Sequence, residues 1–417
     1  MFELLPAPPV DPLWDLTAEY AADPRPERLD LVLGVYRDDT GTTPVMAAVR
    51  QAEIRLAERS ASKEYRGLSG NTAFNRAMLT TVLGDGAPTA HPAGAGAGAG
   101  STPAPAAVAV QTVAGTGALR LLAELVRQTR PGTTVWVSDP AYVNHRPILE
   151  GAGLTVRPFR WLDPAAPADA TALLDGLREA GPGDVVLLQG CCHNPTGADP
   201  SPEIWRELAS LAEANGWVPF VDLAYHGLGD GLDADLWPTR MLAERLPEVL
   251  IAVSCSKNFG LYSDRTGCAI VVGGSARTLR NAETALQNAA RALYSMPPDH
   301  GAAVVATVLG DDVLRAAWRA ELDVMRLRIA SHRADLSARL GGLGHERLGS
   351  ALALQKGMFS MLPLAPDAML RMRRRFGIYG TTAGRINLAG VPAHRIPFLA
   401  RGIADALRVP SSTVGVA

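Results

Sequence analysis

Seven short apolar runs, bounded by Gly, Asp or Pro, constrain the fold of this chain more than any other feature. Between most of them lie stretches with helical spacing, such as GALRLLAELVRQT (117–129) and SPEIWRELASLAEANG (201–216). Strands that alternate with helices predict a doubly wound, mostly parallel α/β sheet covered on both faces. The expected strands are VAVQTV (108–113), TVWVSD (134–139), LTVRPF (154–159), VVLLQG (185–190), VPFVDLA (218–224), VLIAVS (249–254) and CAIVVGG (268–274).

The pattern changes after this core. Residues 299–340 have helical spacing over a long distance. Short strands are then expected in LALQKGMFSMLPL (352–364) and GRINLAG (384–390), followed by an amphipathic helix near 394–408. These features predict a second, smaller α+β lobe.

The domain boundaries follow from these patterns. We expect a large domain over 46–310 and a small domain over 311–417. Residues 1–45 carry too little regular structure to fold alone, so we expect an N-terminal arm that packs on the small domain or on a partner subunit. HPAGAGAGAGSTPAPAA (91–107) is low in complexity and is interpreted as a flexible surface insertion.

Composition excludes several classes of protein. The formal net charge of −2 argues against a nucleic-acid role, and RMRRRF (371–376), the main basic cluster, is interpreted as a solvated helix face. No apolar run is long enough to cross a bilayer, and the N-terminus does not resemble a secretion signal, so the cytoplasm is the expected location. The histidines show no ligand spacing, so no metal site is expected. Small buried side chains are expected for the four cysteines, Cys191, Cys192, Cys255 and Cys268.

Lys257 is notable because the chain contains only three lysines, the others being Lys63 and Lys356. A lysine amine can become neutral and nucleophilic, whereas an arginine stays charged. Lys257 follows the expected strand 249–254, together with Ser254, Ser256 and Arg265, which could surround a phosphate. The alternative is an ordinary surface lysine.

Other expected strand ends carry weaker signals. AGTGALR (114–120) could bind an anion at a helix N-terminus, or be an ordinary turn. Asn194 lies in a turn before a proline, which alone is unremarkable. Asp222 could anchor a cationic ring nitrogen with Tyr225 nearby, or serve as a helix cap or ion-pair partner. Together these features fit one ligand, pyridoxal 5′-phosphate.

The chain resembles the aspartate and aromatic amino acid aminotransferases, which are pyridoxal-phosphate enzymes of fold type I. The likeness runs from MFELLPAPPVDPLWDL nearly to the C-terminus. It rests on ordered motifs: GTGALR, CCHNPTG, DLAYHG, SCSKNFGLYSDRTG, RALYSMPP, GMFSML and AGRINLAG.

The resemblance implies a role for each matching cofactor residue. Lys257 would be the Schiff-base lysine, Asp222 would keep the pyridine nitrogen protonated, and Asn194 and Tyr225 would contact the phenolic oxygen. The implied catalytic residues are Lys257, Asp222 and Tyr225. The implied cofactor-binding residues also include Gly115, Thr116, Tyr142, Ser254, Ser256, Arg265 and, from a neighbouring subunit, Tyr65.

The resemblance also implies a set of substrate-binding residues. Arg385 would bind the α-carboxylate, and Arg291 of the other subunit would bind a distal carboxylate, so a homodimer with shared sites is expected. Gly34, Tyr142, Asn194, Met296 and Phe359 complete the implied substrate-binding set. Arg291 suggests an acidic amino acid with its 2-oxo acid, and an arginine able to move aside would also admit aromatic substrates.

This chain departs from the family pattern at the substrate-facing wall. Tyr142 replaces a usual tryptophan, Met296 a usual asparagine and Gln189 a common histidine, while His145 and His193 fit hydrogen-bonding roles near the cofactor. The expected reaction is ping-pong transamination of acidic or aromatic L-amino acids. The alternatives are elimination, replacement or carbon–carbon bond formation through a quinonoid intermediate in specialised metabolism, and a non-catalytic sensor module, for which no DNA-binding pattern is present.

Overall fold

The computed structural model describes residues 2–5, 12–59, 62–84 and 106–408. Of the expected insertion at 91–107, all but the last two residues lie outside these ranges. The chain divides into two compact units. The sheet unit comprises Pro44–Asn194 and Ala198–Leu327, and the terminal unit comprises Met1–Thr43, Pro195–Gly197 and Arg328–Ala417. None of the helices in the described ranges has the length and apolar character needed to span a membrane.

The sheet unit is built on a seven-stranded sheet with the order β2-β8-β7-β6-β5-β3-β4. Strands β4, β3, β5, β6 and β7 pair in parallel, and β8 is antiparallel to both of its neighbours. This confirms the predicted fold class. The strands are β2 (Ala107–Val113), β3 (Thr134–Asp139), β4 (Thr155–Arg160), β5 (Val185–Gln189), β6 (Val218–Leu223), β7 (Glu248–Ser254) and β8 (Thr266–Gly273).

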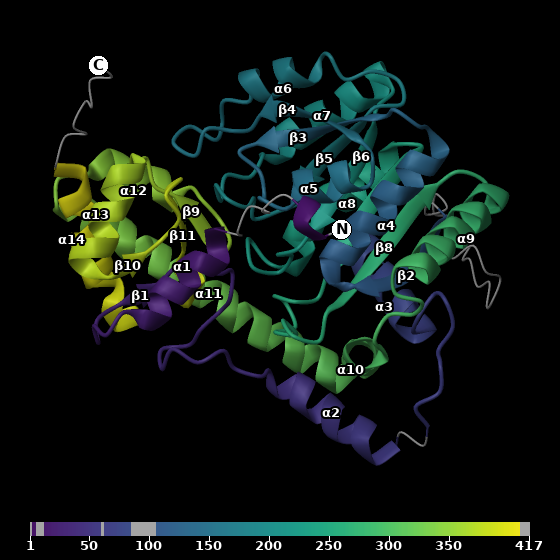
Figure 1. The fold of residues 1–417 in the computed structure, drawn as a ribbon, viewed down its shortest axis with the longest axis horizontal. Helices are drawn as coiled ribbons and strands as arrows, with labels where there is room; N and C mark the ends of the chain where they lie inside the picture. Colours follow the sequence, from purple (N-terminus) through teal and green to yellow (C-terminus); the bar gives the residue numbers. More distant parts are fainter. Residues whose placement is uncertain (1, 6–11, 60–61, 85–105, 409–417) are drawn as a thin grey trace. The chain divides into compact units, whose positions relative to one another are not determined.

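Both faces of this sheet are buried, which explains why its strands read as continuous apolar runs. Along β5, Val185 and Leu187 belong to a core cluster shared with α4, α5 and α9, whereas Val186 and Leu188 alternate with them and are also buried. In Figure 1, α4 and α9 lie beside β2 and β8, and contacts between α4 and β8 and between α9 and β2 agree with this view.

Helix α7 of the sheet unit begins and ends where the local sequence predicts. Ser201 caps α7 by accepting a hydrogen bond from the N–H of Ile204, Pro202 is its first residue, and Gly216 ends it in the left-handed conformation. The helices are α2 (Ala47–Arg59), α3 (Thr72–Leu83), α4 (Ala114–Thr129), α5 (His145–Gly151), α6 (Thr171–Leu177), α7 (Pro202–Asn215), α8 (Leu232–Arg245), α9 (Ala276–Leu293) and α10 (Asp299–Gly310).

The terminal unit combines segments from both ends of the chain. Parallel pairing joins β1 (Leu29–Asp30) to β10 (Ile378–Tyr379), and antiparallel pairing joins β9 (Phe359–Met361) to β11 (Arg385–Asn387). The division between the units falls inside α11 (Asp312–Gly342). The remaining elements are η1 (Phe2–Leu4), α1 (Pro12–Ala22), α12 (Glu346–Ala353), α13 (Pro366–Phe376), η2 (Leu388–Gly390), η3 (Ala393–Arg395) and α14 (Ile396–Arg408).

Candidate active site

The turn from β2 into α4 lies at the carboxyl edge of the sheet, where an anion site was predicted. Ala114 has a φ of 56°, and its N–H donates to the carbonyl of Arg265 at 2.8 Å. Within the described part of the chain, no side chain caps α4, so the N–H groups that follow Ala114 in its first turn are available to a ligand. A Cβ atom on Gly115 would lie 2.9 Å from Cβ of Ser254, which explains the glycine. Thr116 is exposed in the first turn of the helix.

The segment after β7 supplies polar and cationic groups to the same region. The N–H of Ser256 donates to Oγ of Ser254 at 3.3 Å. The guanidinium of Arg265 donates to Oγ of Ser256 at 3.4 Å and to the carbonyl of Tyr262 at 3.0 Å. Ser254, Ser256 and Arg265, the residues predicted to surround a phosphate, therefore form one connected group.

Asp222 lies at the end of β6 and is paired with the first residue of α5. Nε2 of His145 is 2.8 Å from Oδ2 of Asp222, and the two side chains are almost wholly buried. Helix α5 packs on the face of the sheet that carries Phe220. Asp222 lies two residues further along β6, so its side chain is on the same face. The imidazole thus fixes the orientation of a buried carboxylate.

Asn194 and Tyr225 meet beside this pair. Nδ2 of Asn194 donates to the phenolic oxygen of Tyr225 at 3.3 Å, and both residues are buried. The Tyr142 ring is half-buried and makes an edge contact with the His145 ring, with centroids 5.3 Å apart and planes at 90°. The structure therefore brings four of the predicted residues together with His145.

The amine of Lys257 lies 5.0 Å from the ring centroid of Tyr225. Burial lowers the pKa of Lys257 from 10.5 to about 8; the carboxylate of Asp222 raises it, and the positive charge of Arg265 lowers it further. A substantial fraction of the amine is therefore neutral at mildly alkaline pH, as nucleophilic chemistry requires.

The predicted carboxylate-binding residue, Arg385, lies in the terminal unit. Arg385 is buried, donates to the carbonyl of Val32 at 2.7 Å, and lies over the Phe359 ring at 4.6 Å. A Cβ atom on Gly34 would lie 2.7 Å from Cζ of Phe359. The structure thus places Gly34 and Arg385 around Phe359, three of the predicted substrate-binding residues.

The contacts that the structure shows for Arg291 and Met296 lie outside the Lys257 group, and Tyr65 is exposed. Tyr65 is 92% exposed, and Arg291 is exposed and donates to Oγ of Ser295 at 2.9 Å. The sulfur of Met296 accepts from the N–H of Arg66 at 3.1 Å. Within the described ranges, no hydrogen bond or ion pair joins Tyr65 or Arg291 to Lys257, Asp222 or Tyr225.

Comparison with known proteins identifies the family. Residues 26–403 match the profile of aminotransferase class I and II. The chain belongs to this family. It is 44% identical over 397 residues to an aromatic-amino-acid aminotransferase of Paracoccus denitrificans, covering 95% of this chain and 97% of that one. It is 40% identical over 408 residues to an aspartate aminotransferase of Salmonella typhi, covering 98% and 100% of the two chains.

Solved structures support the same family assignment. An aromatic-amino-acid aminotransferase from Burkholderia pseudomallei, described as covalently bound to pyridoxal phosphate, superposes with a TM-score of 0.91 at 34% identity. That comparison covers 98% of this chain and 100% of the other. Pyridoxal phosphate is the cofactor of this aminotransferase.

The residues present fit that cofactor. The uncapped N-terminus of α4, which packs closely on Ser254 at Gly115, suits a phosphate. Among the described residues, the Asp222 side chain makes one hydrogen bond, through Oδ2 to His145, so Oδ1 remains available to a ring nitrogen. The Lys257 amine has no hydrogen bond within the described residues and a lowered pKa, as an amine that condenses with an aldehyde requires.

Several supporting residues of this aminotransferase were not assigned from the sequence. Gln189 makes two hydrogen bonds with the backbone of Asn194, accepting from its N–H at 2.8 Å and donating to its carbonyl at 2.9 Å. Asn387 donates to the carbonyls of Leu33 and Val35 at 2.7 and 2.8 Å, which holds the segment around Gly34. In the sequence, Gln189 is a departure from the family pattern, but its hydrogen bonds could not be predicted from it.

His193, in contrast, is held away from a direct catalytic role by its packing. Its ring stacks on Trp161 with centroids 4.3 Å apart, and its Nε2 lies 3.1 Å from Oγ of Ser138. Burial lowers the pKa of His193 well below its usual value. A neutral ring that supports the turn before Asn194 fits these contacts.

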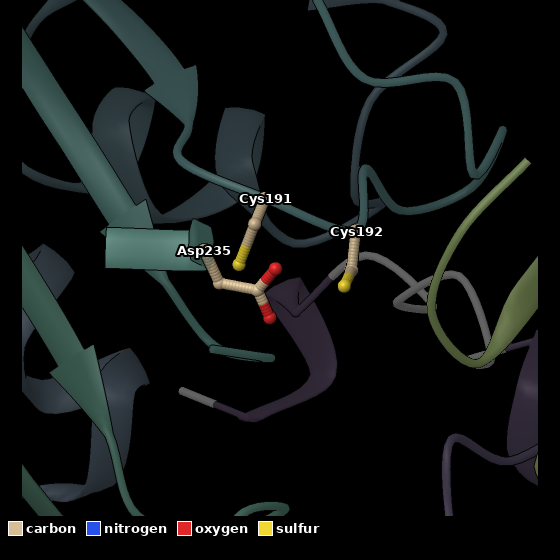
Figure 2. A group of neighbouring side chains, drawn as sticks. All are labelled: Cys191, Cys192 and Asp235. Carbon is tan, nitrogen blue, oxygen red and sulfur yellow. The ribbon is translucent and has the colours of Figure 1, made fainter. Parts of the chain in front are cut away.

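Cys191, Cys192 and Asp235 form a buried cluster whose potential ligand atoms lie within 4.8 Å of one another. Figure 2 shows the Cys191 side chain pointing toward the Asp235 carboxylate. That carboxylate already accepts three backbone N–H groups, from Gly227, Gly229 and Asp230, at 2.8 to 2.9 Å. The neighbouring Cys192 thiol and burial raise the pKa of Cys191, which disfavours a thiolate ligand.

All four cysteines are buried and none forms a disulfide, as predicted. The cluster therefore anchors loops, and we assign no metal to it.

Proposed function

We propose that this aminotransferase moves the amino group between an acidic or aromatic L-amino acid and a 2-oxo acid. The observation that carries the proposal is the Lys257 amine, with its pKa lowered to about 8, lying 5.0 Å from the Tyr225 ring centroid. The names of the relatives support the substrate class, since these include aromatic-amino-acid, aspartate and tyrosine aminotransferases at 40 to 44% identity.

The cofactor would be held at three points. Its phosphate would bind the N-terminus of α4 and the group formed by Ser254, Ser256 and Arg265. Asp222, oriented by His145, would pair with the ring nitrogen and favour its protonated form. Asn194 and Tyr225 would donate hydrogen bonds to the phenolic oxygen. When bound, the cofactor supplies an aldehyde that condenses with amines and a ring that withdraws electrons from the substrate α-carbon.

Lys257 is the proposed proton carrier. As a neutral amine it can take the proton from the α-carbon and give it back, so it holds the proton during the transfer. The neighbouring Asp222 carboxylate and the Tyr225 ring face stabilise the ammonium that forms.

Arg385 is the proposed partner of the substrate α-carboxylate, because a planar guanidinium can bind both oxygens. The contacts of Arg385 with Val32 and Phe359 hold its side chain in one orientation. Recognition of the α-carboxylate would therefore fall to the terminal unit.

We infer a homodimer in which Arg291 and Tyr65 complete the partner's site. The exposure of Tyr65 and Arg291, and the lack of any hydrogen bond or ion pair from either to Lys257, Asp222 or Tyr225 among the described residues, support this inference. Arg291 would bind a distal carboxylate, with Tyr142 and Met296 beside the substrate. The buried free cysteines support a cytoplasmic location.

A spectral titration tests the function. The purified protein should absorb in the visible, and borohydride reduction followed by peptide mapping should label Lys257 rather than Lys63 or Lys356. Glutamate, aspartate or phenylalanine should convert the visible band to an ultraviolet band with release of a 2-oxo acid. The Lys257→Ala variant is the control and should lack both responses. Release of ammonia in place of conversion would contradict transamination.

A further inference from the structure

A buried hydrogen bond joins the two loops that carry Tyr225 and Lys257. Nδ2 of Asn258 lies 2.7 Å from Nε2 of His226, and both side chains are fully buried. His226 follows Tyr225 in the loop after β6, and Asn258 follows Lys257 in the loop after β7. The bond therefore connects positions adjacent in sequence to the phenol and the amine.

The Lys257 side of this bond is anchored to helix α11. The indole N–H of Trp318 donates to the carbonyl of Asn258 at 2.8 Å. Trp318 is buried and stacks on Phe259, with ring centroids 4.4 Å apart and planes at 8°. These contacts fix the backbone on the C-terminal side of Lys257.

The Tyr225 side is anchored to α8. The carboxylate of Asp235 accepts the N–H groups of Gly227, Gly229 and Asp230. A Cβ atom on Gly227 would lie 2.4 Å from Cδ2 of Leu322, so the loop also packs closely on α11. Each loop is thus held by contacts of its own, and the His226–Asn258 hydrogen bond joins one loop to the other.

We propose that His226 is a positioning residue, whose hydrogen bond with Asn258 holds the Lys257 amine over the ring of Tyr225. The inference rests on the proposed role of Lys257. The ring face attracts a cationic amine, and this attraction weakens as the separation grows. A change in the spacing of the loops therefore changes the proton affinity of the amine and the geometry of proton transfer.

The link itself is insensitive to pH near neutrality. Burial lowers the pKa of His226 to about 4, so its imidazole is neutral above about pH 5. A neutral ring makes the bond in either tautomer, provided that the Asn258 amide is oriented to match. A side chain of similar length that both donates and accepts hydrogen bonds should therefore replace His226.

The test compares His226→Phe and His226→Gln in the holoenzyme. We expect His226→Phe to move the pH midpoint of the cofactor's visible absorption by about half a pH unit or more. We also expect it to lower kcat about tenfold with little change in KM. His226→Gln should restore both values toward those of the parent protein.

A matched control separates positioning from general destabilisation. Leu173→Ala removes a buried side chain from α6, which packs on the edge strand β4, and should lower the melting temperature without moving the pH midpoint. If His226→Phe loses as much stability as Leu173→Ala but keeps the parent midpoint and kcat, the inference is overturned.

A second variant covers the case in which His226→Phe does not fold. Trp318→Phe removes the hydrogen bond to the Asn258 carbonyl and retains an aromatic ring against Phe259. We expect it to shift the pH midpoint of the cofactor's visible absorption in the same direction as His226→Phe does. An unchanged midpoint in a folded Trp318→Phe protein would contradict the inference. Failure of the proposed function is distinguished by Lys257→Ala, because a visible band that persists in that variant would refute the role of Lys257 itself.

Discussion

Nε2 of His145 lies 2.8 Å from Oδ2 of Asp222, and neither side chain has appreciable contact with solvent. A carboxylate at this position can favour a protonated partner through its charge, and the imidazole prevents it from rotating. The pair joins the end of β6 to the start of α5, which are far apart in sequence.

Asp222→Asn tests that charge. An amide has similar shape and retains hydrogen bonding but cannot stabilise a protonated ring nitrogen. We expect kcat to fall by about 10²–10³-fold, the range seen when one preorganised electrostatic group is lost, with cofactor binding weakened less. Steady-state kinetics and cofactor titration measure the two effects. A kcat within a few-fold of the parent value would remove Asp222 from its proposed role.

The lowered pKa of Lys257 predicts a specific dependence of stability on pH in the cofactor-free protein. The unfolded lysine binds a proton up to about pH 10.5, and the folded one up to about pH 8. The unfolded state therefore binds more protons in this window, so the free energy of unfolding rises with pH across it. Burying the ammonium destabilises the protein below about pH 8.

Lys257→Met should remove this penalty. We expect the variant to be more stable than the parent at pH 7, by at most about 3 kcal/mol, and the difference to shrink as pH approaches 10. Urea unfolding at several pH values checks this, with the exposed Lys63→Met as the control. A pH-independent difference would show that Lys257 does not titrate in this window.

Gln189→Met tests the support of Asn194. The substitution keeps the length of the side chain but removes both hydrogen bonds to the Asn194 backbone. Because an unpaired buried N–H or carbonyl costs about 1–3 kcal/mol, we expect a loss of about 2–4 kcal/mol in the free energy of unfolding. Chemical denaturation measures it. Gln189→Glu, which retains the acceptor, should lose less stability at neutral pH; equal losses would argue against the two-bond account.

Arg291→Ala distinguishes acidic from aromatic substrates. A substrate carboxylate left buried without its partner is penalised by several kcal/mol, whereas an aromatic side chain loses no ionic partner. We expect kcat/KM for aspartate and glutamate to fall about 10²–10³-fold and that for phenylalanine to change less than about tenfold. Equal losses for both classes would remove Arg291 from its proposed role.

The sequence predicts the central sheet well because each buried strand is a compact apolar run with a clear end. Asp222 is an example: the run 218–224 locates β6, and the carboxyl end of a parallel strand is where ligands collect. Helix α4 begins at Ala114, three residues before the helical spacing found at 117–129, and Ala114 has a positive φ at this turn.

Contacts between segments distant in sequence could not be predicted from the sequence. Asn387 binds the carbonyls of Leu33 and Val35 across more than 350 residues, and nothing in either segment specifies that pairing. Strands β1 and β10 contain two residues each, too few to show any periodicity. The His226–Asn258 bond likewise depends on how two loops meet after folding.

The reversed direction of β8 decides where Arg265 is found. Because β8 runs against β7, the residue that precedes it emerges at the edge where the other strands end, beside Ser254. Had the eight residues of β8 run the other way, Arg265 would lie about 26 Å away, at the opposite rim of the sheet. One antiparallel strand in an otherwise unidirectional array thus brings the proposed counter-charge of the phosphate to this edge.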